Sequence, residues 1–205
     1  MNDIKAIFFD LGNVIVRFDF NILEKGLSPY GYKPTENMWD FIVYDKLPVK
    51  YMRGKITSSK FYEFVSRRFK IKASYREFYE VWNSIFYPYP EVEEIINNLK
   101  EKYPKIPLIL VSDTNEEHFG YVKNNYKILN KLDHYVLSHE VGAVKPNSKM
   151  YTSALKLAGV PARNVFYTDD RDDLIKSARS MGLRAFQFTG HTGLREQLLN
   201  CGMEV

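Results

Sequence analysis

The sequence predicts an α/β fold: a parallel sheet flanked by helices, with a small helical cap inserted after the first strand. Three observations favour it. Short apolar segments end in polar residues, helical patterns lie between these segments, and one long stretch near the N-terminus lacks the alternation. Strands that alternate with helices form parallel sheets whose two faces are covered.

Four segments have the apolar character and the turn-forming ends of buried strands. They are Ile4–Phe9, Leu108–Val111, Asn164–Thr168 and Arg184–Phe188. In parallel sheets of this kind, ligands bind beyond the carboxyl ends of the strands. We therefore expect the polar residues that follow these segments to share one edge of the sheet.

Helical periodicity fills the intervals between the predicted strands. Apolar residues recur at i, i+3, i+4 and i+7 in Val92–Leu99 and again in Tyr151–Ala158. Gly159 and Gly182 stand where the C-terminal caps of helices belong. The pattern therefore predicts helices that connect successive parallel strands.

The alternation stops at residues 17–89, which contain several helical patterns and no clear buried strand. One of these helices begins after Thr57. The YPYP stretch at residues 87–90 is a candidate hinge, because proline restricts both itself and the residue before it. We expect a core domain formed by residues 1–16 and 90–205, and a helical cap domain formed by residues 17–89.

Composition indicates a globular protein, since 45% of its 205 residues are apolar and 26% are charged. This length allows one sizeable core with a subdomain. The apolar N-terminal stretch lacks a basic leader and a cleavage site, so we expect neither a signal peptide nor a membrane span. Cys201 is the single cysteine, which excludes an intrachain disulfide and makes the cytoplasm the expected location.

The net charge of +4 is unevenly distributed, because the predicted cap has 13 Lys and Arg against 8 Asp and Glu. These charges are scattered, with no run longer than Arg67-Arg68, and they favour an anionic small molecule over nucleic acid. The cap also holds 19 of the 31 aromatic residues, which we expect to form mainly its core. The oligomeric state is left open.

Four polar elements should meet at the sheet edge: Asp10, Ser112, Lys145 and the acidic cluster at residues 169–173. A carboxylate attacks phosphorus when a metal and cationic or hydroxyl donors cancel the repulsion between the two anions. Asp10 is the candidate nucleophile. Ser112 and Lys145 are the candidate donors to the phosphoryl group.

Carboxylate oxygens suit Mg²⁺, which usually takes one or two protein carboxylates together with substrate phosphate. Asp10 and Asp170 would suffice. Backbone amides beside these groups would complete a phosphate cradle. The candidate substrate-binding residues follow two of the predicted strands: Gly12, Asn13, Asp113, Thr114 and Asn115.

Four segments, FFDLGNV, LVSDTN, VKPNSKMY and FYTDDRDD, resemble in order the four motifs of the haloacid dehalogenase-like (HAD) hydrolases. The resemblance covers essentially the whole chain. Within this superfamily, the DLGNV form and the RGKIT segment at residues 53–57 are similar to bacterial α-D-glucose-1-phosphate phosphatases. The N-terminal phosphatase domains of epoxide hydrolases are also similar.

The resemblance implies a Rossmann-like core with a C1-type helical cap, and a phosphatase that uses Mg²⁺. It implies that Asp10 is both nucleophile and metal ligand. The Gly12 carbonyl and Asp170 would be the further ligands, while Asp169 and Asp173 would hold metal-bound waters. The implied reaction is hydrolysis of small phosphate monoesters, such as glucose 1-phosphate, through a phospho-aspartate.

The sequence departs from the pattern of these phosphatases at two places. Most of them carry an acid two residues after the nucleophile, where this chain has Gly12. General acid–base help is typically worth about 10²–10⁴ in rate, so its loss matters most for esters with poor leaving groups. Asp113 and Asp173 also stand where relatives often have amides, and their extra negative charge would alter metal or phosphate binding.

Three alternative functions follow from the same residues. A 2-haloacid dehalogenase also uses the first-motif aspartate, without the later acid or a metal, but the Asp169-Asp170 pair argues against it. A phospho-receiver domain combines acids, a hydroxyl and a lysine, but has its phosphorylated aspartate on a middle strand and no cap. A non-catalytic phosphate-binding protein is favoured by Gly12 and Asp113.

Other polar residues have weaker claims to a role. Arg17 and Asp19 follow the first motif closely, and a place in the site and a hinge salt bridge are equally good interpretations. The four histidines show no metal-ligand spacing, so we expect them to be structural or exposed. They are His118, His134, His139 and His191.

Overall fold

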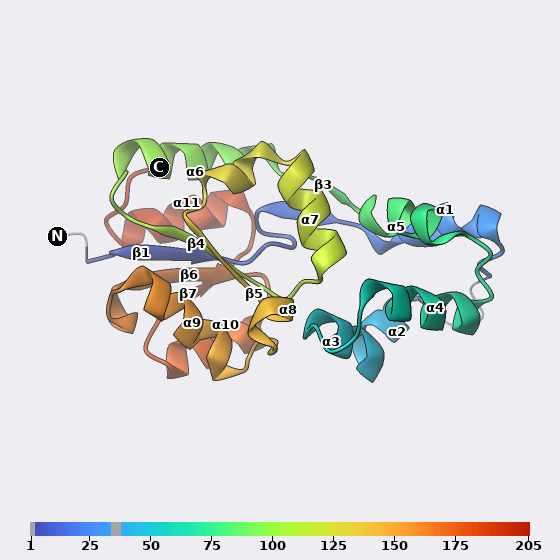
Figure 1. Ribbon diagram of the computed structural model, residues 1–205. Coiled ribbons are helices and arrows are strands. Elements are labelled where there is room, and N and C mark those ends of the chain that lie inside the picture. Colours follow the sequence, from blue (N-terminus) through green and yellow to red (C-terminus); the bar gives the residue numbers. More distant parts are fainter. Residues whose placement is uncertain (1–2, 34–37) are drawn as a thin grey trace.

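The computed structural model describes residues 3–33 and 38–205, and its centre is a five-stranded sheet (Figure 1). All neighbouring strands run parallel, in the order β5-β4-β1-β6-β7. The strands are β1 (Ala6–Phe9), β4 (Leu108–Ser112), β5 (His134–Leu137), β6 (Val165–Asp169) and β7 (Arg184–Gln187). The predicted α/β fold is therefore confirmed.

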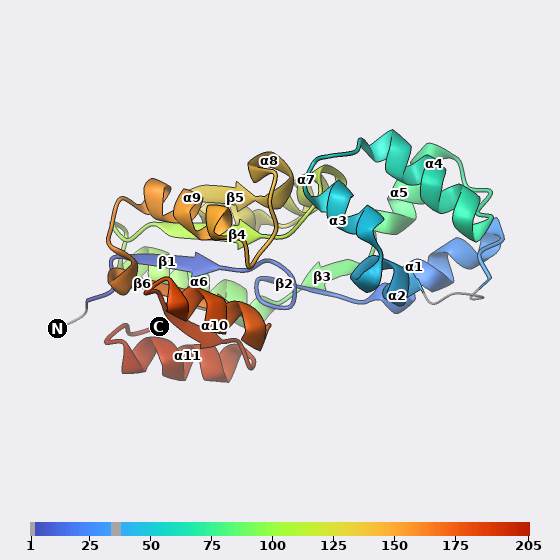
Figure 2. The same cartoon turned by 90° about the horizontal axis from the view of Figure 1, so that it is seen from below.

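Helices cover both faces of this sheet, as the two views in Figures 1 and 2 show. One face carries α6 (Pro90–Lys102), α7 (Glu116–Asn125) and α11 (His191–Asn200). The other face carries α9 (Ser148–Ala158) and α10 (Asp172–Ser180). Ile7 and Phe9 pack toward the first set, whereas Ala6 and Phe8 pack toward the second. A strand buried on both faces reads as a continuous apolar run, which is why β1 is visible in the sequence.

Capping residues begin and end the helices where the sequence predicts. Thr57 precedes α4 (Ser58–Phe69), and its side chain accepts a hydrogen bond from the backbone N–H of Lys60. Gly159 follows α9 with φ 65°, and Gly182 follows α10 with φ 85°. Glycine adopts this left-handed conformation at little cost, so both residues end their helices cleanly.

Strand β5 is the one strand of the sheet that the sequence pattern does not predict. It lies at the edge of the sheet and pairs only with β4 among the described strands. Its first two residues, His134 and Tyr135, are half-buried. An edge strand needs no continuous apolar run, and β5 therefore lacks the signal that identifies β1, β4 and β6.

The inserted segment is a helical cap that lies beyond one end of the sheet (Figure 1). Its helices are α1 (Phe20–Leu27), α2 (Met38–Tyr44), α3 (Lys46–Met52), α4 and α5 (Tyr75–Asn83). The chain enters the cap through β2 (Val16–Phe18) and leaves it through β3 (Phe86–Pro88), and these two strands pair antiparallel. Both strands are short and largely exposed, so they lack the buried apolar pattern on which the sequence prediction depends.

The remaining elements are short turns of helix. They are η1 (Ser28–Tyr30), η2 (Lys127–Lys131), α8 (Ser138–Val141) and η3 (Ala162–Asn164). Within the described ranges, no helix has the length and apolar character that a membrane crossing requires.

Among the described residues, two groups of contacts join helices of the cap to helices of the core. At α5 and α7, the Trp82 ring stacks on His118 with 5.0 Å between ring centroids, and the Tyr75 hydroxyl donates to Glu117 at 2.8 Å. At α3 and α8, the Ser138 hydroxyl donates to the Met52 carbonyl at 2.6 Å. The two contacts hold the cap over the carboxyl ends of the core strands.

Candidate active site

Asp10 follows β1 directly, at the centre of the sheet's carboxyl edge. Its backbone N–H donates to the carbonyl of Thr168 on β6 at 3.0 Å, which continues the β1–β6 ladder by one more bond. The residue is only 9% exposed. Its carboxylate accepts a hydrogen bond from the Lys145 ammonium, with 2.6 Å between Nζ and Oδ1. The first and third sequence motifs therefore meet in one buried ion pair.

Lys145 serves two carboxylates at once. Its Nζ lies 2.6 Å from Asp10 Oδ1 and 2.6 Å from Asp169 Oδ2. The Lys145 side chain is 2% exposed and that of Asp169 is 1% exposed. Since solvent is excluded, this lysine is the main positive charge that offsets the two carboxylates.

Tyr167 completes this buried network from β6. Its hydroxyl donates to Asp169 and accepts from the Lys145 ammonium at 3.5 Å. Tyr167 and Asp169 are two residues apart on one strand, and their side chains therefore point to the same face. This alternation is the signal by which the sequence could have identified Tyr167, which lies outside the roles that the motifs suggest.

Asp170 adds a third carboxylate to the edge. Ligand oxygens of Asp10, Asp169 and Asp170 all lie within 4.8 Å of one another. The Asn13 side-chain amide donates to Asp170 at 3.3 Å, and Asn13 has φ 57°. Asparagine tolerates this left-handed conformation better than most residues, which suits the tight turn after β1.

The electrostatics of this cluster favour another positive charge. Burial raises the pKa of the Asp10 carboxyl to about 7, although Lys145 acts against the rise and Asp169 adds to it. Burial also raises the pKa of Asp170. Burial opposes the charge on Lys145, but Asp10 and Asp169 outweigh it and raise the lysine pKa. Three carboxylates against one lysine, all with oxygen ligands, fit a hard divalent cation such as Mg²⁺.

The segment that follows β4 lies beside Asp10. Ser112 is the last residue of β4 and is 2% exposed. Asp113 accepts a hydrogen bond from the backbone N–H of Lys145 at 2.9 Å, which ties this segment to the lysine. Asn115 caps α7 by accepting from the N–H of His118 at 3.0 Å. Thr114 is buried between them and donates its N–H to Ser138 Oγ at 2.9 Å.

Gly12 faces an aromatic side chain from the base of the cap. A Cβ atom placed on Gly12 would lie 2.7 Å from Cε1 of Phe18. This distance is shorter than real contacts, so an acid at position 12 would require the Phe18 ring to move. The ring, at the end of β2, therefore occupies the direction in which an acid at position 12 would project.

Some predicted residues are placed outside the cluster. Asp173 is exposed and pairs with Arg171, with 2.7 Å between Oδ2 and Nη2, so the structure does not bring it to the three carboxylates. Arg17 stacks over the Tyr89 ring at 3.9 Å. Asp19 caps α1 by accepting from the N–H of Asn21. Both candidates near the hinge thus have local partners.

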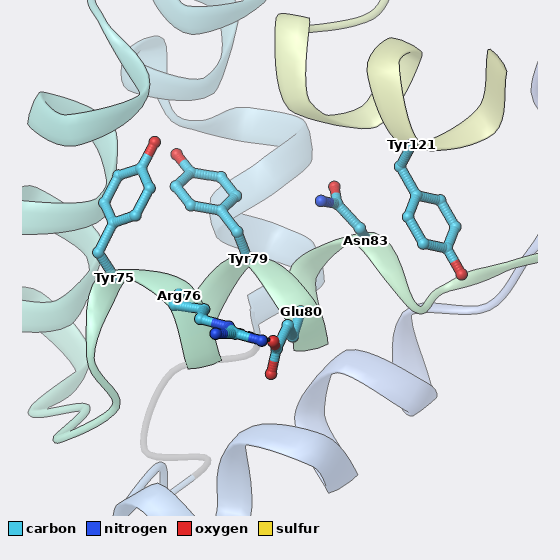
Figure 3. A pocket seen from close by; sticks show the side chains of 6 residues that line it. All are labelled: Tyr75, Arg76, Tyr79, Glu80, Asn83 and Tyr121. Atoms are coloured by element: carbon cyan, nitrogen blue, oxygen red, sulfur yellow. Dashed lines mark hydrogen bonds and ion pairs between the residues drawn. The ribbon is translucent and has the colours of Figure 1, made fainter. Parts of the chain in front are cut away.

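A pocket of about 380 Å³ lies elsewhere, between α5 and α7 (Figure 3). Five of the residues that line it come from α5 and one comes from α7. They are Tyr75, Arg76, Tyr79, Glu80, Asn83 and Tyr121. None of the candidate site residues lines this pocket, so it is separate from the carboxylate cluster.

The fold and the cluster define the class of this protein: a capped α/β protein with a carboxylate-centred site at the edge of a parallel sheet. The family model of haloacid dehalogenase-like hydrolases matches residues 7–188. The chain therefore belongs to the haloacid dehalogenase-like hydrolase family.

Solved structures share this fold. A HAD family enzyme from Bacteroides thetaiotaomicron, BT-2542, superposes with a TM-score of 0.79 at 22% identity, covering 90% of this chain and 93% of that one. The L-2-haloacid dehalogenase PA0810 superposes with a TM-score of 0.67 at 18% identity, covering 89% of this chain and 82% of that one.

A curated relative is longer than this chain. The drimenol cyclase drtB of Aspergillus calidoustus is 23% identical over 209 residues, which cover 96% of this chain and 36% of the relative. The chain thus spans about a third of the length of that relative.

Proposed function

We propose that this chain is a Mg²⁺-dependent phosphatase that hydrolyses small phosphate monoesters through a phospho-aspartate on Asp10. Sugar phosphates such as glucose 1-phosphate are the proposed substrates. The observation that carries the proposal is the convergence of Asp10, Asp169 and Asp170, whose ligand oxygens lie within 4.8 Å of one another, with Lys145 paired to the first two. Such a site has a nucleophile and an excess of acidic oxygens.

A metal ion is part of the proposal because the charges require one. A phosphate monoester brings further negative charge to three clustered carboxylates, of which Asp10 and Asp169 pair with the buried Lys145. Asp10 and Asp170 would hold Mg²⁺, which would neutralise the approach of the two anions and polarise the phosphoryl group. The enzyme BT-2542 was crystallised with magnesium and inorganic phosphate, and this supports the same ligands here.

In the first proposed step, a carboxylate oxygen of Asp10 attacks phosphorus, the ester P–O bond breaks, and the leaving alkoxide takes a proton from water. Lys145 holds the attacking carboxylate in position and favours its ionised form. Ser112 would donate its hydroxyl to a phosphoryl oxygen. In the second step, water attacks the phospho-aspartate, which releases inorganic phosphate and restores the Asp10 carboxylate.

Gly12 narrows the range of substrates that we propose. Because residue 12 is glycine, it has no carboxyl group to protonate the leaving group. The Phe18 ring occupies the direction in which a side chain at this position would project. General acid help is typically worth about 10²–10⁴ in rate. Esters with good leaving groups, such as aryl phosphates and the anomeric phosphate of glucose 1-phosphate, should therefore react faster than simple alkyl phosphates.

The test is phosphate release from para-nitrophenyl phosphate and glucose 1-phosphate, with Mg²⁺ and with a chelator. We expect activity that requires Mg²⁺ and falls by at least about 10³-fold in Asp10→Asn, because the nucleophile is lost. Asp172→Asn is the matched control, since this exposed aspartate pairs only with Lys176 in the described interactions. Equal rates in wild type and Asp10→Asn would refute the proposed mechanism.

A dehalogenase is the second candidate, because Gly12 removes the acid that a phosphatase usually carries and because the fold is shared with PA0810. Halide release from a 2-haloacid that persists in a chelator would favour this function. A phosphorylated form that survives for hours after treatment with acetyl phosphate would instead favour a receiver, and binding of phosphate without release from any ester would favour a non-catalytic protein.

A further inference from the structure

Ser138, the first residue of α8, is fully buried where the cap contacts the core. Its hydroxyl has three backbone neighbours. It lies 2.6 Å from the carbonyl of Met52 in the cap, and 2.8 Å from the carbonyl of Thr114 beside the candidate site. It also accepts the N–H of Thr114 at 2.9 Å. One side chain therefore joins the cap backbone to the segment that follows Ser112.

The Ser138 hydroxyl has one proton but two carbonyl acceptors within reach. A serine hydroxyl donates one hydrogen bond, so it serves either the Met52 carbonyl or the Thr114 carbonyl at one time. His139 resolves the competition, because its Nδ1 lies 3.2 Å from the Thr114 carbonyl. When Nδ1 carries the proton, His139 satisfies Thr114 and leaves the serine proton for the cap.

The cap side of this contact is close-packed. Gly54 lies against the backbone of α8, where a Cβ atom on Gly54 would clash with the carbonyl oxygen of His139. Gly54 also has φ 63°, a conformation that favours glycine. The chain from Met52 to Gly54 can therefore approach α8 closely enough for the Met52 carbonyl to reach Ser138.

The core side leads directly to the candidate site. Thr114 lies between Asp113, which holds the backbone of Lys145, and Asn115, which caps α7. Both N–H and carbonyl of Thr114 face Ser138. A change in the direction in which Ser138 donates therefore changes the hydrogen bonding of the segment that carries Ser112.

We infer that Ser138 is a positioning residue that couples docking of the cap to the conformation of the segment 112–115. When the cap is docked, the serine proton goes to Met52 and His139 holds the Thr114 carbonyl. When the cap moves away, the proton returns to Thr114. The inference rests on the proposed function only in taking the segment 112–115 as the phosphate-binding loop.

The experiment compares two variants that act from opposite sides. Gly54→Ala pushes the cap away from α8 without touching Ser138, and Ser138→Ala removes the hydroxyl. Gly120→Ala on α7 is the matched control, since a Cβ there meets nothing within 4 Å. The readouts are hydrogen exchange by NMR and the affinity for inorganic phosphate with Mg²⁺. Exchange is followed at the Thr114 amide and, as the cap reporter beside Gly54, at the Lys55 amide, which donates to the Lys50 carbonyl at 2.9 Å.

We expect Gly54→Ala to accelerate exchange at both amides, about tenfold at Thr114, although the substitution lies in the cap. Ser138→Ala should accelerate Thr114 exchange at least as much, and Gly54→Ala should add nothing there in the Ser138→Ala background. The Gly120→Ala control should match wild type. Phosphate affinity should fall in both single variants without adding in the double variant.

Three results would overturn the inference. The first is that Gly54→Ala accelerates amide exchange at Lys55 but not at Thr114. The second is that Gly54→Ala leaves the exchange rates of both amides at their wild-type values. The third is that the effects of Gly54→Ala and Ser138→Ala on Thr114 exchange add in the double variant. If Ser138→Ala does not fold, the Gly54→Ala result alone still decides between coupling and independence. If wild type binds no phosphate, the proposed function fails, whereas hydrogen exchange still decides this inference because it is read without substrate.

Discussion

The carboxyl edge of the sheet and the cap bury different kinds of side chain. At the sheet edge, charged side chains are buried together: Asp10, Lys145 and Asp169 are joined through hydrogen bonds of the lysine. In the cap, the interior is aromatic, and Phe61 stacks on Tyr51 with 4.3 Å between ring centroids. No charged side chain is buried in the parts of the cap that the structure describes.

The difference shows which part of the protein is arranged for stability and which for chemistry. Buried ion pairs contribute little net stability, because removing charges from water costs about as much as their attraction returns. Aromatic burial stabilises directly. The cap therefore gains its stability from packing, whereas the core accepts a charged edge because its two apolar layers stabilise it. Four substitutions test this contrast.

Lys145→Met should cause the largest loss of stability, about 3–5 kcal/mol in urea unfolding at pH 8, because two buried carboxylates lose their shared cation. The loss should shrink as the pH falls, since burial raises the pKa of Asp10 and a proton can then neutralise this carboxylate in the folded variant. Lys149→Met, an exposed lysine nearby, is the control. A loss below about 1 kcal/mol at pH 8 would mean that the charged edge does not depend on the lysine.

Phe61→Ala should cost about 3 kcal/mol, because it removes a fully buried ring that also packs edge-on against Trp82. The loss should be the same at pH 8 and pH 6, unlike that of Lys145→Met, and hydrogen exchange should accelerate in the cap first. Phe64→Ala on the same helix is the control, since that residue is 46% exposed. Similar losses in both variants would contradict an aromatic cap core.

His118 should make stability depend on pH at the boundary of cap and core. Burial lowers its pKa to about 3, and the neutral ring donates Nε2–H to the Trp82 carbonyl at 3.1 Å. Because this pKa lies below the unfolded value of about 6.5, its contribution is complete above pH 6.5 and is lost progressively toward pH 3. The expected loss is about 2 kcal/mol between pH 8 and pH 5.

Urea unfolding of wild type and His118→Gln across this pH range measures the contribution. The glutamine amide can still donate to the carbonyl but does not titrate there, so the variant should lose less stability on acidification. Parallel pH profiles of the two proteins would show that burial does not lower the His118 pKa.

Tyr167→Phe should have the smallest effect, about 1 kcal/mol, because it removes one hydrogen bond to Asp169 while Lys145 still donates to that carboxylate. The measurement is urea unfolding, together with the affinity for Mg²⁺. Tyr44→Phe in the cap, at a residue 78% exposed, is the control. A loss as large as that of Lys145→Met would make the hydroxyl, not the lysine, the centre of the network.

The sequence predicts the parts of this structure that repeat a strong pattern. Strands β1, β4 and β6 are fully buried, and the residues that follow β1 and end β6 meet at the sheet edge, so Asp10 and Asp169 could be placed together beforehand. Strand β5 could not be placed, because only Val136 and Leu137 of its four residues are buried, which is too short an apolar run to predict a strand. The roles that the sequence suggests for Ser112, the Gly12 carbonyl and Asp173 stay predictions.

Contacts that depend on three-dimensional packing were not visible in the sequence. Phe18 reaches Gly12 because the chain turns after β1 and Val16 forms a β-bridge with Gly12, and Ser138 reaches Met52 across 86 positions of the chain. Neither residue has a motif of its own. Tyr167 could be predicted in part. Strand alternation places its side chain on the same face as Asp169, but it does not predict the hydrogen bond that the hydroxyl makes.

The pairing of β2 with β3 has a consequence for how this protein can change. Val16 lies opposite Pro88, and Phe18 lies opposite Phe86, so the chain leaves the cap beside the point where it entered. An insertion whose two ends are neighbours adds little closure entropy to its host, whatever its length. The cap can therefore be exchanged: a different domain inserted between β2 and β3 would place different side chains over the substrate and leave Asp10 unchanged.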